Sequence, residues 1–206
     1  MPLPYVRLVD PASYLLPDIV RTPRLQLRPP TVEDAAAVAQ ARGESYAELL
    51  PWFHQIMGQP SQEHDARWQS ERLAQAAEAA QRRERLSYLA WASSACIGGV
   101  DLIPVWRRGQ FRLSYWMRSS ASGQGYGAEA VNAMIRTAFE VLDARLVTTG
   151  HAVPNTASAR LAQKLGFRKI AHQPLGCELP DGLLVDGIAY AIEDIAVLPP
   201  LEISWA

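Results

Sequence analysis

The chain has 206 residues, of which 49% are hydrophobic, and it carries a formal net charge of −1 with a pI near 6.4. This length and apolar content can form one hydrophobic core without disulfides or a metal. The near-neutral charge argues against a protein that binds nucleic acid or an anionic membrane. Two distant cysteines and four scattered histidines indicate a reduced, cytoplasmic protein without a metal site. Every apolar run is shorter than the ~18 residues of a membrane-spanning helix.

The first part of the chain predicts mainly helix. Thr31, with Asp34 three residues later, is typical of a capping box at a helix start. Ser61 can cap a second helix after a loop that contains prolines. We expect, in chain order, an irregular arm over residues 1–20, a strand over 24–28, a helix from 31 to about 50, a loop over 51–60 and a helix from 61 to about 85.

The remaining part alternates strands with helices. Large apolar side chains at every second position from 111 to 117 predict a half-buried strand. We expect strands over 87–92, 96–102 and 110–118, a helix over 128–142, a strand over 145–150, a helix over 155–165, a loop around 174–182 and a final strand over 188–195. This order predicts an α/β fold with a twisted mixed sheet of about six or seven strands and helices on both faces.

A glycine-spaced turn joins the strand over 110–118 to the helix that follows. Gly123, Gly125 and Gly127 stand at alternate positions, so the backbone can turn tightly and direct its N–H groups inward. The free N–H groups and the dipole of the helix N-terminus point to the same place. The segment therefore predicts a site for a phosphate-bearing cofactor. The alternative is a plain solvent-exposed turn before a surface helix.

Three known glycine patterns compete for this turn. A P-loop requires Lys and then Ser or Thr after the last glycine, where this chain has Ala128 and Glu129. A dinucleotide-binding fingerprint fits the glycines, but the next strand ends without the acidic residue that binds a ribose. Residues 122–127, SGQGYG, resemble the pyrophosphate loop of the GNAT acyltransferase superfamily, (Gln/Arg)-x-x-Gly-x-(Gly/Ala). Ser122 departs from that pattern at its first position.

A second segment carries the same resemblance. Residues 154–170, PNTASARLAQKLGFRKI, are similar to the N-x-x-S…KLGF segment of the RimJ/RimL-type branch of the superfamily. The segment also predicts a short helix that Asn155 or Thr156 caps and that Gly166 ends in a left-handed conformation. The resemblance extends over about residues 22–195. It implies a single acyl-CoA N-acyltransferase domain, 1–206, with its core over 22–195, an N-terminal arm over 1–20 and a C-terminal tail over 196–206.

The resemblance implies acetyl-CoA as the cofactor. In such a site the strand before the loop pairs with the pantetheine arm, and one N–H near Met117 polarises the thioester carbonyl. Asn155 would bind the pantetheine arm and Ser158 the departing sulfur; their alternative roles are a helix cap and a small packing residue. The expected cofactor-binding residues are Trp116, Met117, Arg118, Ser122, Gly123, Gln124, Gly125, Tyr126, Gly127, Asn155 and Ser158.

The resemblance further implies that an amine attacks the thioester directly in a ternary complex. Ser158 and Glu178 are the expected catalytic residues, with Glu178 as the base; the alternative for Glu178 is a solvated loop residue. A one-residue shift of the alignment would place Cys177 there instead. Arg112 stands where the family often has a glutamate, which removes one usual base. The reserve carboxylates, which we expect to be structural, are Glu129 and Asp186.

The acceptor is expected to be a protein or peptide N-terminus or a small amine. Trp52, Phe53 and His54 follow a proline and are expected to bind it, unless they only cover the core. We expect no nucleic-acid or membrane partner, and a homodimer remains open. The missing glutamate at Arg112 leaves a second function open, a CoA-binding regulatory or partner-binding module without transferase activity. A nucleotide-dependent oxidoreductase is the third interpretation.

Overall fold

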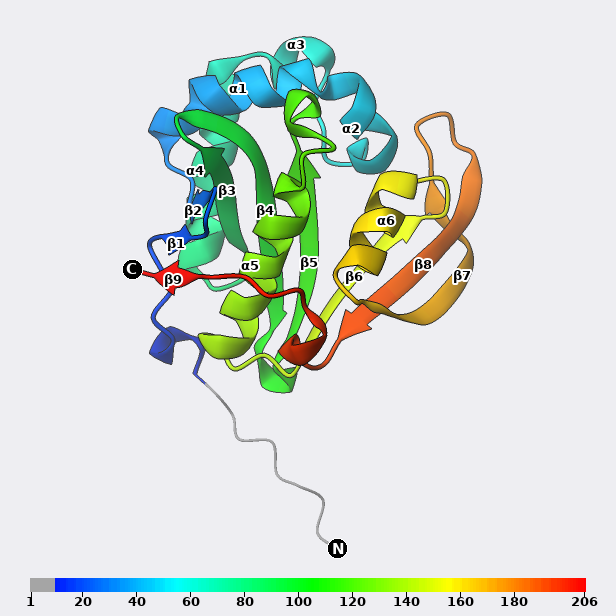
Figure 1. Ribbon diagram of the computed structural model, residues 1–206. Coiled ribbons are helices and arrows are strands. Elements are labelled where there is room, and N and C mark those ends of the chain that lie inside the picture. Colours follow the sequence, from blue (N-terminus) through cyan, green and yellow to red (C-terminus); the bar gives the residue numbers. More distant parts are fainter. Residues whose placement is uncertain (1–9) are drawn as a thin grey trace, which may run out of the picture.

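The computed structural model describes residues 10–206, which fold around one mixed sheet of nine strands in the order β7-β8-β6-β5-β4-β3-β2-β1-β9 (Figure 1). The strands are β1 (Val20–Arg21), β2 (Gln26–Arg28), β3 (Leu86–Ala92), β4 (Ala95–Val105), β5 (Gln110–Met117), β6 (Leu146–Ala152), β7 (Arg168–Glu178), β8 (Leu184–Ile192) and β9 (Ser204–Trp205). Only β5 and β6 are parallel neighbours. The α/β class is confirmed, whereas six or seven strands were too few because the short strands β1 and β9 extend one edge.

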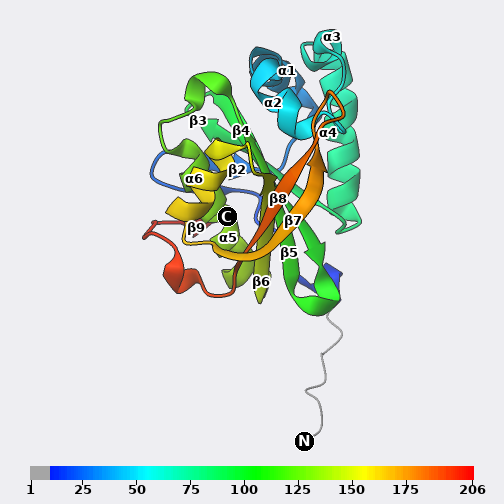
Figure 2. The same cartoon turned by 90° about the vertical axis from the view of Figure 1, so that its right-hand side faces the viewer.

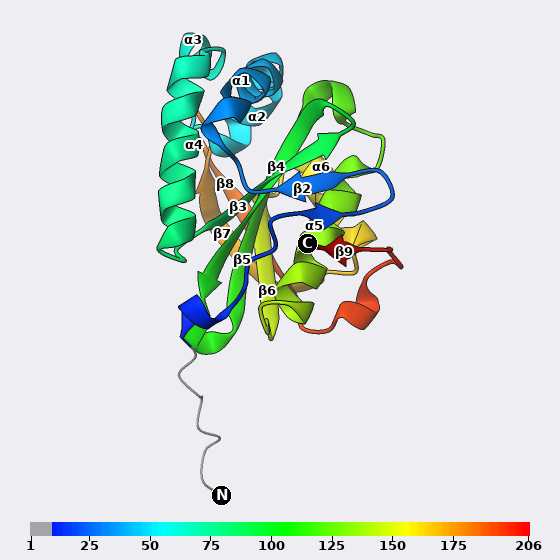
Figure 3. The ribbon, with the colours of Figure 1, turned by 90° about the vertical axis from the view of Figure 1, so that its left-hand side faces the viewer.

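Helices cover both faces of this sheet, as the sequence predicted. The helices are α1 (Ala35–Glu44), α2 (Tyr46–Phe53), α3 (Pro60–Glu63), α4 (Ala66–Gln81), α5 (Tyr126–Glu140) and α6 (Thr156–Lys164). Short 3-10 helices are η1 (Pro11–Ser13), η2 (Val32–Asp34), η3 (Trp106–Arg108), η4 (Ser119–Ala121) and η5 (Ile195–Val197). Figure 3 shows α1 to α4 on one side of the sheet and α5 and α6 on the other.

The two long N-terminal helices predicted from the sequence are each divided. The Thr31 N–H donates to Asp34 Oδ2 at 2.8 Å, so the capping box is present, but it starts η2 rather than an α-helix. The chain leaves helical geometry at Ser45, and α2 then continues through Pro51 to Phe53, where a loop was expected. A second interruption falls at Asp65, whose carboxylate accepts from the Arg67 N–H and caps α4.

Two hydrophobic cores fill the two faces. The larger core lies between the sheet and α5, where Phe111, Met134 and Ile135 are fully buried. The buried positions of α5 are 130–135, 137 and 138, so the middle of this helix is covered on nearly all sides. The smaller core lies between the sheet and α1 and α4, and includes Val38 and Leu73. The site described below lies at the edge between these two layers.

The C-terminal strands form a long antiparallel hairpin that the sequence did not predict. A loop was expected over 174–182, but β7 runs to Glu178 and leaves only residues 179–183 as the turn (Figure 2). The pairing register shifts between Gln173 and Cys177, and Leu175 has a φ of 52°. This bulge on an edge strand tolerates Pro174, because no ladder hydrogen bond needs an N–H there.

Candidate active site

A cleft opens where β5 and β6 diverge. The two strands pair only over the first residues of β5, Gln110 to Arg112, and no pairing continues toward Met117. The last contact is a hydrogen bond from Thr149 Oγ1 to the Leu113 carbonyl at 3.1 Å. Figure 1 shows the two strands separating toward α2. The second half of β5 therefore presents an unpaired backbone edge to the cleft.

The pairing of β5 with β4 decides which of its amides face this cleft. The Arg118 N–H donates to the Ile97 carbonyl at 2.8 Å. Because antiparallel pairs alternate, Trp116 turns its N–H toward β4, and Tyr115 and Met117 turn theirs away. Met117 thus offers the N–H that the sequence assigned to the thioester carbonyl. The N–H groups of Trp116 and Arg118 face β4, and the contact of these two residues with the cofactor stays a prediction.

The glycine turn after β5 forms a cradle of free N–H groups. The amides of residues 123–128 donate to no acceptor within residues 10–206. Gly125, the residue before α5, has a φ of 83°, a left-handed conformation in which any other residue would be strained. Six free donors therefore lie at and just before the positive end of a 15-residue helix. Such a cradle fits a pyrophosphate.

The other residues predicted for this loop hold its conformation and add no charge to it. Ser122 Oγ donates to the Arg118 carbonyl at 3.3 Å, and Gln124 Nε2 donates to the Ser120 carbonyl at 2.9 Å. A β-carbon at Gly127 would approach Met117 Cγ to 3.2 Å, so glycine is needed where α5 packs on β5. These bonds hold the turn without consuming the amides of the cradle.

Two cationic side chains that the sequence analysis did not identify flank the cradle. A β-carbon built at Gly125 would lie 3.4 Å from Arg24 Nη2 and 3.9 Å from Lys164 Nζ. The Arg24 guanidinium also lies 4.5 Å from the centre of the Tyr126 ring. Arg24 comes from the segment before β2 and Lys164 from the end of α6, so only the tertiary structure brings them to the loop. A negative ligand in the cradle would meet both charges.

Helix α6 brings Asn155 and Ser158 to the cleft. The Asn155 side chain accepts from the Ser158 N–H at 3.0 Å and so caps α6, as the sequence predicted. The end of the helix is also as predicted, since the Phe167 N–H bonds to the Ala162 carbonyl and Gly166 has a φ of 74°. Asn155 is buried and Ser158 is half-buried.

A tyrosine that the sequence analysis did not select lies beside Ser158. Burial raises the pKa of Tyr115, and the neighbouring Ser158 hydroxyl opposes that rise. The side chain of Tyr115 packs at the edge of the larger core, on the face that α6 covers. Two hydroxyl groups, one from β5 and one from α6, therefore meet beside the unpaired edge of β5.

The expected base lies apart from this group. Glu178 is the last residue of β7, is exposed, and forms neither a hydrogen bond nor an ion pair among the described residues. The reserve carboxylates are structural. Asp186 accepts from the Leu175 N–H and pairs with His172 at 2.7 Å, and both contacts lower the pKa of Asp186. Glu129 pairs with Arg24 in the first turn of α5.

Trp52, Phe53 and His54 lie in and just after the last turn of α2, near the open end of the cleft (Figure 1). All three are half-buried, and His54 Nδ1 is buried with no hydrogen-bond partner among residues 10–206. Their aromatic rings therefore face partly into the protein and partly toward solvent.

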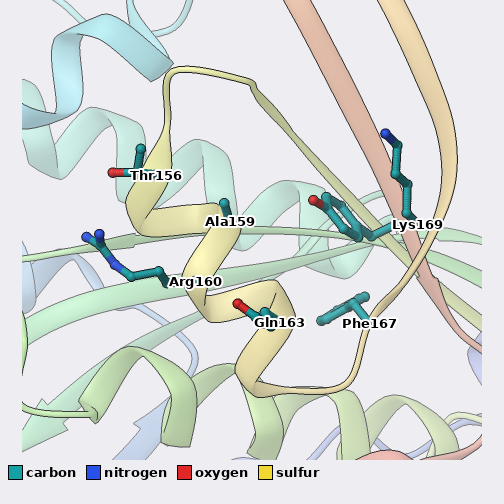
Figure 4. A pocket seen from close by; sticks show the side chains of 7 residues that line it. Thr156, Ala159, Arg160, Gln163, Phe167 and Lys169 are labelled. Carbon is teal, nitrogen blue, oxygen red and sulfur yellow. The ribbon is translucent and has the colours of Figure 1, made fainter.

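A separate open hollow of about 440 Å³ lies on the other side of α6. Figure 4 shows Arg160 and Gln163 of α6 on one side of it, and Phe167 and Lys169 on the other. None of the residues predicted for the active site lines it. Elsewhere in residues 10–206, no group of three or more His, Cys, Asp or Glu is placed to hold a metal ion. No helix in the same range has the length and apolarity required to cross a membrane.

Comparison with known proteins agrees with this geometry. Residues 24–168, more than half of the chain, match the family model described as the acetyltransferase (GNAT) domain. None of the curated protein sequences matches the chain. Among solved structures, RimJ of Mycobacterium smegmatis in complex with CoA-disulfide is 21% identical, with a TM-score of 0.78 over 85% of this chain and 87% of that chain.

Two further structures share the fold. The ribosomal-protein-S5-alanine acetyltransferase of Vibrio fischeri is 19% identical, with a TM-score of 0.75 over 88% of this chain and 99% of that one. RimL, a ribosomal L7/L12 alpha-N-protein acetyltransferase in complex with coenzyme A, is 19% identical, with a TM-score of 0.77 over 86% and 99%.

Proposed function

Because this chain belongs to the GNAT acetyltransferase family, we propose that its acceptor is the α-amine of a peptide or protein. The chain is an enzyme that transfers an acetyl group from acetyl-CoA to an amine. A CoA-binding module without activity is therefore not the function that the family indicates. The names of the structural relatives, two of them ribosomal-protein acetyltransferases, support a RimJ/RimL-like assignment of the acceptor.

One observation carries the proposal: large apolar side chains are exposed on both sides of the open end of the cleft. Ile56, just after α2, is 56% exposed. The opposite side is the β7–β8 hairpin, where Leu175, Leu183 and Leu184 are exposed by 60%, 57% and 48%. Exposed apolar patches of this kind mark sites where another chain binds. A small amine would leave them in water, whereas a peptide would cover them.

The acetyl donor fits the cleft and the cradle. The amides of residues 123–128 would bind the pyrophosphate, and Arg24 and Lys164 would add two charge-assisted contacts. The edge of β5 would hydrogen-bond the pantetheine arm as an added strand does. When bound, acetyl-CoA supplies an activated thioester for attack by the amine.

Residues of the chain would assist this attack at three atoms, which are the carbonyl oxygen, the sulfur and the amine nitrogen. The Met117 N–H would donate a hydrogen bond to the carbonyl oxygen of the bound thioester. Ser158, with Tyr115 beside it, would donate a hydrogen bond to the sulfur and so stabilise the thiolate that leaves. Glu178, which would have to approach through movement of the hairpin or through water, accepts the proton that the amine loses. An α-amine, with a pKa near ~8, needs less help than a lysine near ~10.4.

The proposed acceptor can be tested with peptides. The protein is incubated with acetyl-CoA and short peptides that contain both a free N-terminus and an internal lysine, and the acetylated atom is located by mass spectrometry. We expect acetylation of the α-amine and release of one thiol for each acetyl group transferred. N-terminally formylated versions of the same peptides serve as the matched control. Acetylation of small amines but of no peptide would contradict the proposal.

The free thiols support the expected cytoplasmic location. Cys96 is buried and Cys177 half-buried, and both are unpaired. Reduced cysteines are the rule in a reducing compartment. The homodimer remains a prediction, which a sedimentation measurement can test.

A further inference from the structure

A cluster of arginines lies on the sheet face opposite α5 and α6. It consists of Arg42 from α1, Arg72 from α4 and Arg85 at the start of β3, and is called the arginine cluster below. Asp101 of β4 lies among the three, because each of them acts on its charge. Burial lowers the pKa of Arg72, and the positive charges of Arg42 and Arg85 lower it further. Positive charge is therefore concentrated here.

The carboxylates within this region do not satisfy the cluster. Glu63 is fully buried, and it already accepts from Arg42 Nε, from the Gly58 N–H at 2.9 Å and from Gln69 Nε2 at 3.1 Å. Asp101 faces Arg85 and shares Arg72 with Glu63, so two carboxylates face three guanidinium groups. Burial raises the pKa of Asp101, and the three arginines oppose that rise.

Two guanidinium N–H groups of the arginine cluster also lack a hydrogen-bond acceptor among residues 10–206. Arg42 Nη2 and Arg85 Nε are buried, and neither has a hydrogen-bond acceptor among residues 10–206. Arg42 as a whole is only 8% exposed. Buried polar groups nearly always have a partner, so two orphaned guanidinium N–H groups in one cluster indicate an acceptor that comes from outside the chain. In a purely structural ion network, we would expect these N–H groups to bond to acceptors within the chain.

The register of the sheet places this cluster next to the acceptor side of the cleft. Asp101 pairs with Ser87 on one side and with Ser114 of β5 on the other. Phe111 and Leu113 are buried in the larger core, so Ser114 and Trp116, which alternate with them, face the arginine cluster. The Arg42 guanidinium stacks on the Trp116 ring, 5.3 Å from its centre.

The distance between the arginine cluster and the reacting centre limits which acceptors can contact both. Ser114 and Trp116 are two residues apart, which is ~7 Å along a strand. Helices α5 and α6 cover the other face of the cleft, so the acceptor approaches from the side of α1, α2 and α4 (Figure 3). Arg72, Arg85 and Ser114 are half-buried, so solvent reaches this region. Met117, whose N–H is assigned to the thioester carbonyl, follows Trp116 directly, so an anionic group near Ser114 would lie ~10 Å from the reacting centre, within reach of the first or second residue of a peptide.

We propose that the enzyme selects acceptors with a carboxylate side chain at the first or second residue, which the arginine cluster binds through Arg72 and Arg85. The proposal rests on the proposed function, since it assigns the acceptor class of the same site. The incoming carboxylate would complete the hydrogen bonds of the guanidinium groups and would take the place of Asp101 as their counterion.

The test compares acidic acceptors with their amide isosteres. Peptides that begin Ser-Asp and Ser-Asn, and aspartate α-amide with asparagine α-amide, are acetylated by the intact enzyme, and kcat/KM is measured for each. We expect the acidic member of each pair to be favoured by roughly tenfold or more, the scale of a charge-assisted hydrogen bond. The preference should shrink as salt is added. Equal rates within both pairs would overturn the proposal.

Four variants separate selection from stability and from catalysis. Arg85→Gln and Arg72→Gln should each reduce the acid-over-amide ratio, whereas Arg67→Gln, an exposed arginine of the same helix α4, should leave it unchanged. Asp101→Asn should raise the ratio, because it removes the competing carboxylate. A uniform loss with both members of each pair would show a structural role only. If no peptide is acetylated but aspartate amide is still preferred over asparagine amide, the peptide acceptor fails and the acidic selection stands.

Discussion

The carboxylate of Glu129 holds Arg24 by three contacts, with the Arg24 N–H at 3.0 Å, with Arg24 Nε at 2.6 Å and with Arg24 Nη2 at 2.5 Å. Arg24 Nη1 in turn donates to the Gln124 carbonyl at 3.0 Å. The first turn of α5, the glycine loop and the segment before β2 are thus joined at one point. The Glu129 side chain is only 8% exposed, whereas that of Arg24 is 46% exposed, so the carboxylate is enclosed and the guanidinium reaches solvent.

We predict that Arg24→Ala weakens acetyl-CoA binding. The change removes both a cation beside the cradle and the bond that fixes the Gln124 carbonyl, so the KM for acetyl-CoA should rise by roughly tenfold while kcat changes little. Arg21→Ala is the matched control, because Arg21 is an exposed arginine on the neighbouring strand β1. An unchanged KM in Arg24→Ala would show that Arg24 only braces the helix.

Gly125→Asp should abolish acetyl-CoA binding. The new carboxylate would enter the cradle, where Arg24 and Lys164 would hold it in place of the phosphate. Gly182→Asp is the control for backbone strain, since Gly182 has nearly the same φ, 84°, with no atom within 4 Å of an added β-carbon. Both variants should lose ~1 kcal/mol of stability from the left-handed conformation. Only Gly125→Asp should lose the thermal shift that acetyl-CoA causes, and a normal shift would refute the cradle.

Ser158→Ala should lower kcat at every pH. The variant removes the donor to the departing sulfur, and the loss should not exceed the ~10²–10⁴ of acid–base assistance. Tyr115→Phe should give a smaller loss and should have little further effect in the Ser158→Ala background, because we expect the Tyr115 hydroxyl to act only through the neighbouring Ser158. Additive losses in the double variant would separate their roles. Thr156→Ala, an exposed position of the same helix, is the control.

Glu178→Gln should reduce activity most at low pH. There the acceptor amine is charged and needs a base, whereas near the pKa of the amine enough of it is already neutral. The pH–rate profile of the variant is compared with that of the wild type, at saturating acetyl-CoA. Parallel profiles would remove Glu178 as the base. Acetyl-CoA binding should be unaffected, since Glu178 lies on the hairpin and not in the cradle.

Glu44 should make stability depend on pH in the acid range. Its hydrogen bonds with Arg118 and Ser120 lower its pKa from 4.5 to about 2. A carboxyl with a depressed folded-state pKa stabilises the protein above its unfolded pKa, and that contribution disappears as the pH falls from about 4.5 through about 2. Thermal melting of Glu44→Gln should therefore differ from wild type at neutral pH, and the difference should vanish toward pH 2. A difference that stays constant over this range would show that the charge of Glu44 is irrelevant.

The sequence by itself determined the parts of the site that lie close together along the chain. The glycine spacing over 123–127 predicted the cradle, and Asn155 and Gly166 predicted the two ends of α6, because turns and caps depend on neighbouring residues. The strand over 110–118 was predicted within one residue by its alternating side chains. These features need only local backbone geometry.

The tertiary structure alone decided what meets at the site. Arg24 and Lys164 reach Gly125 from distant segments, and Tyr115 meets Ser158 only because β5 and β6 separate and α6 covers the gap. The arginine cluster likewise joins three elements through the register of β3, β4 and β5. A sequence pattern records the period of each element but not its neighbours, because strand order and register depend on how the whole sheet packs. The sequence therefore predicted a phosphate-binding cradle, but it did not predict the charged side chains around it.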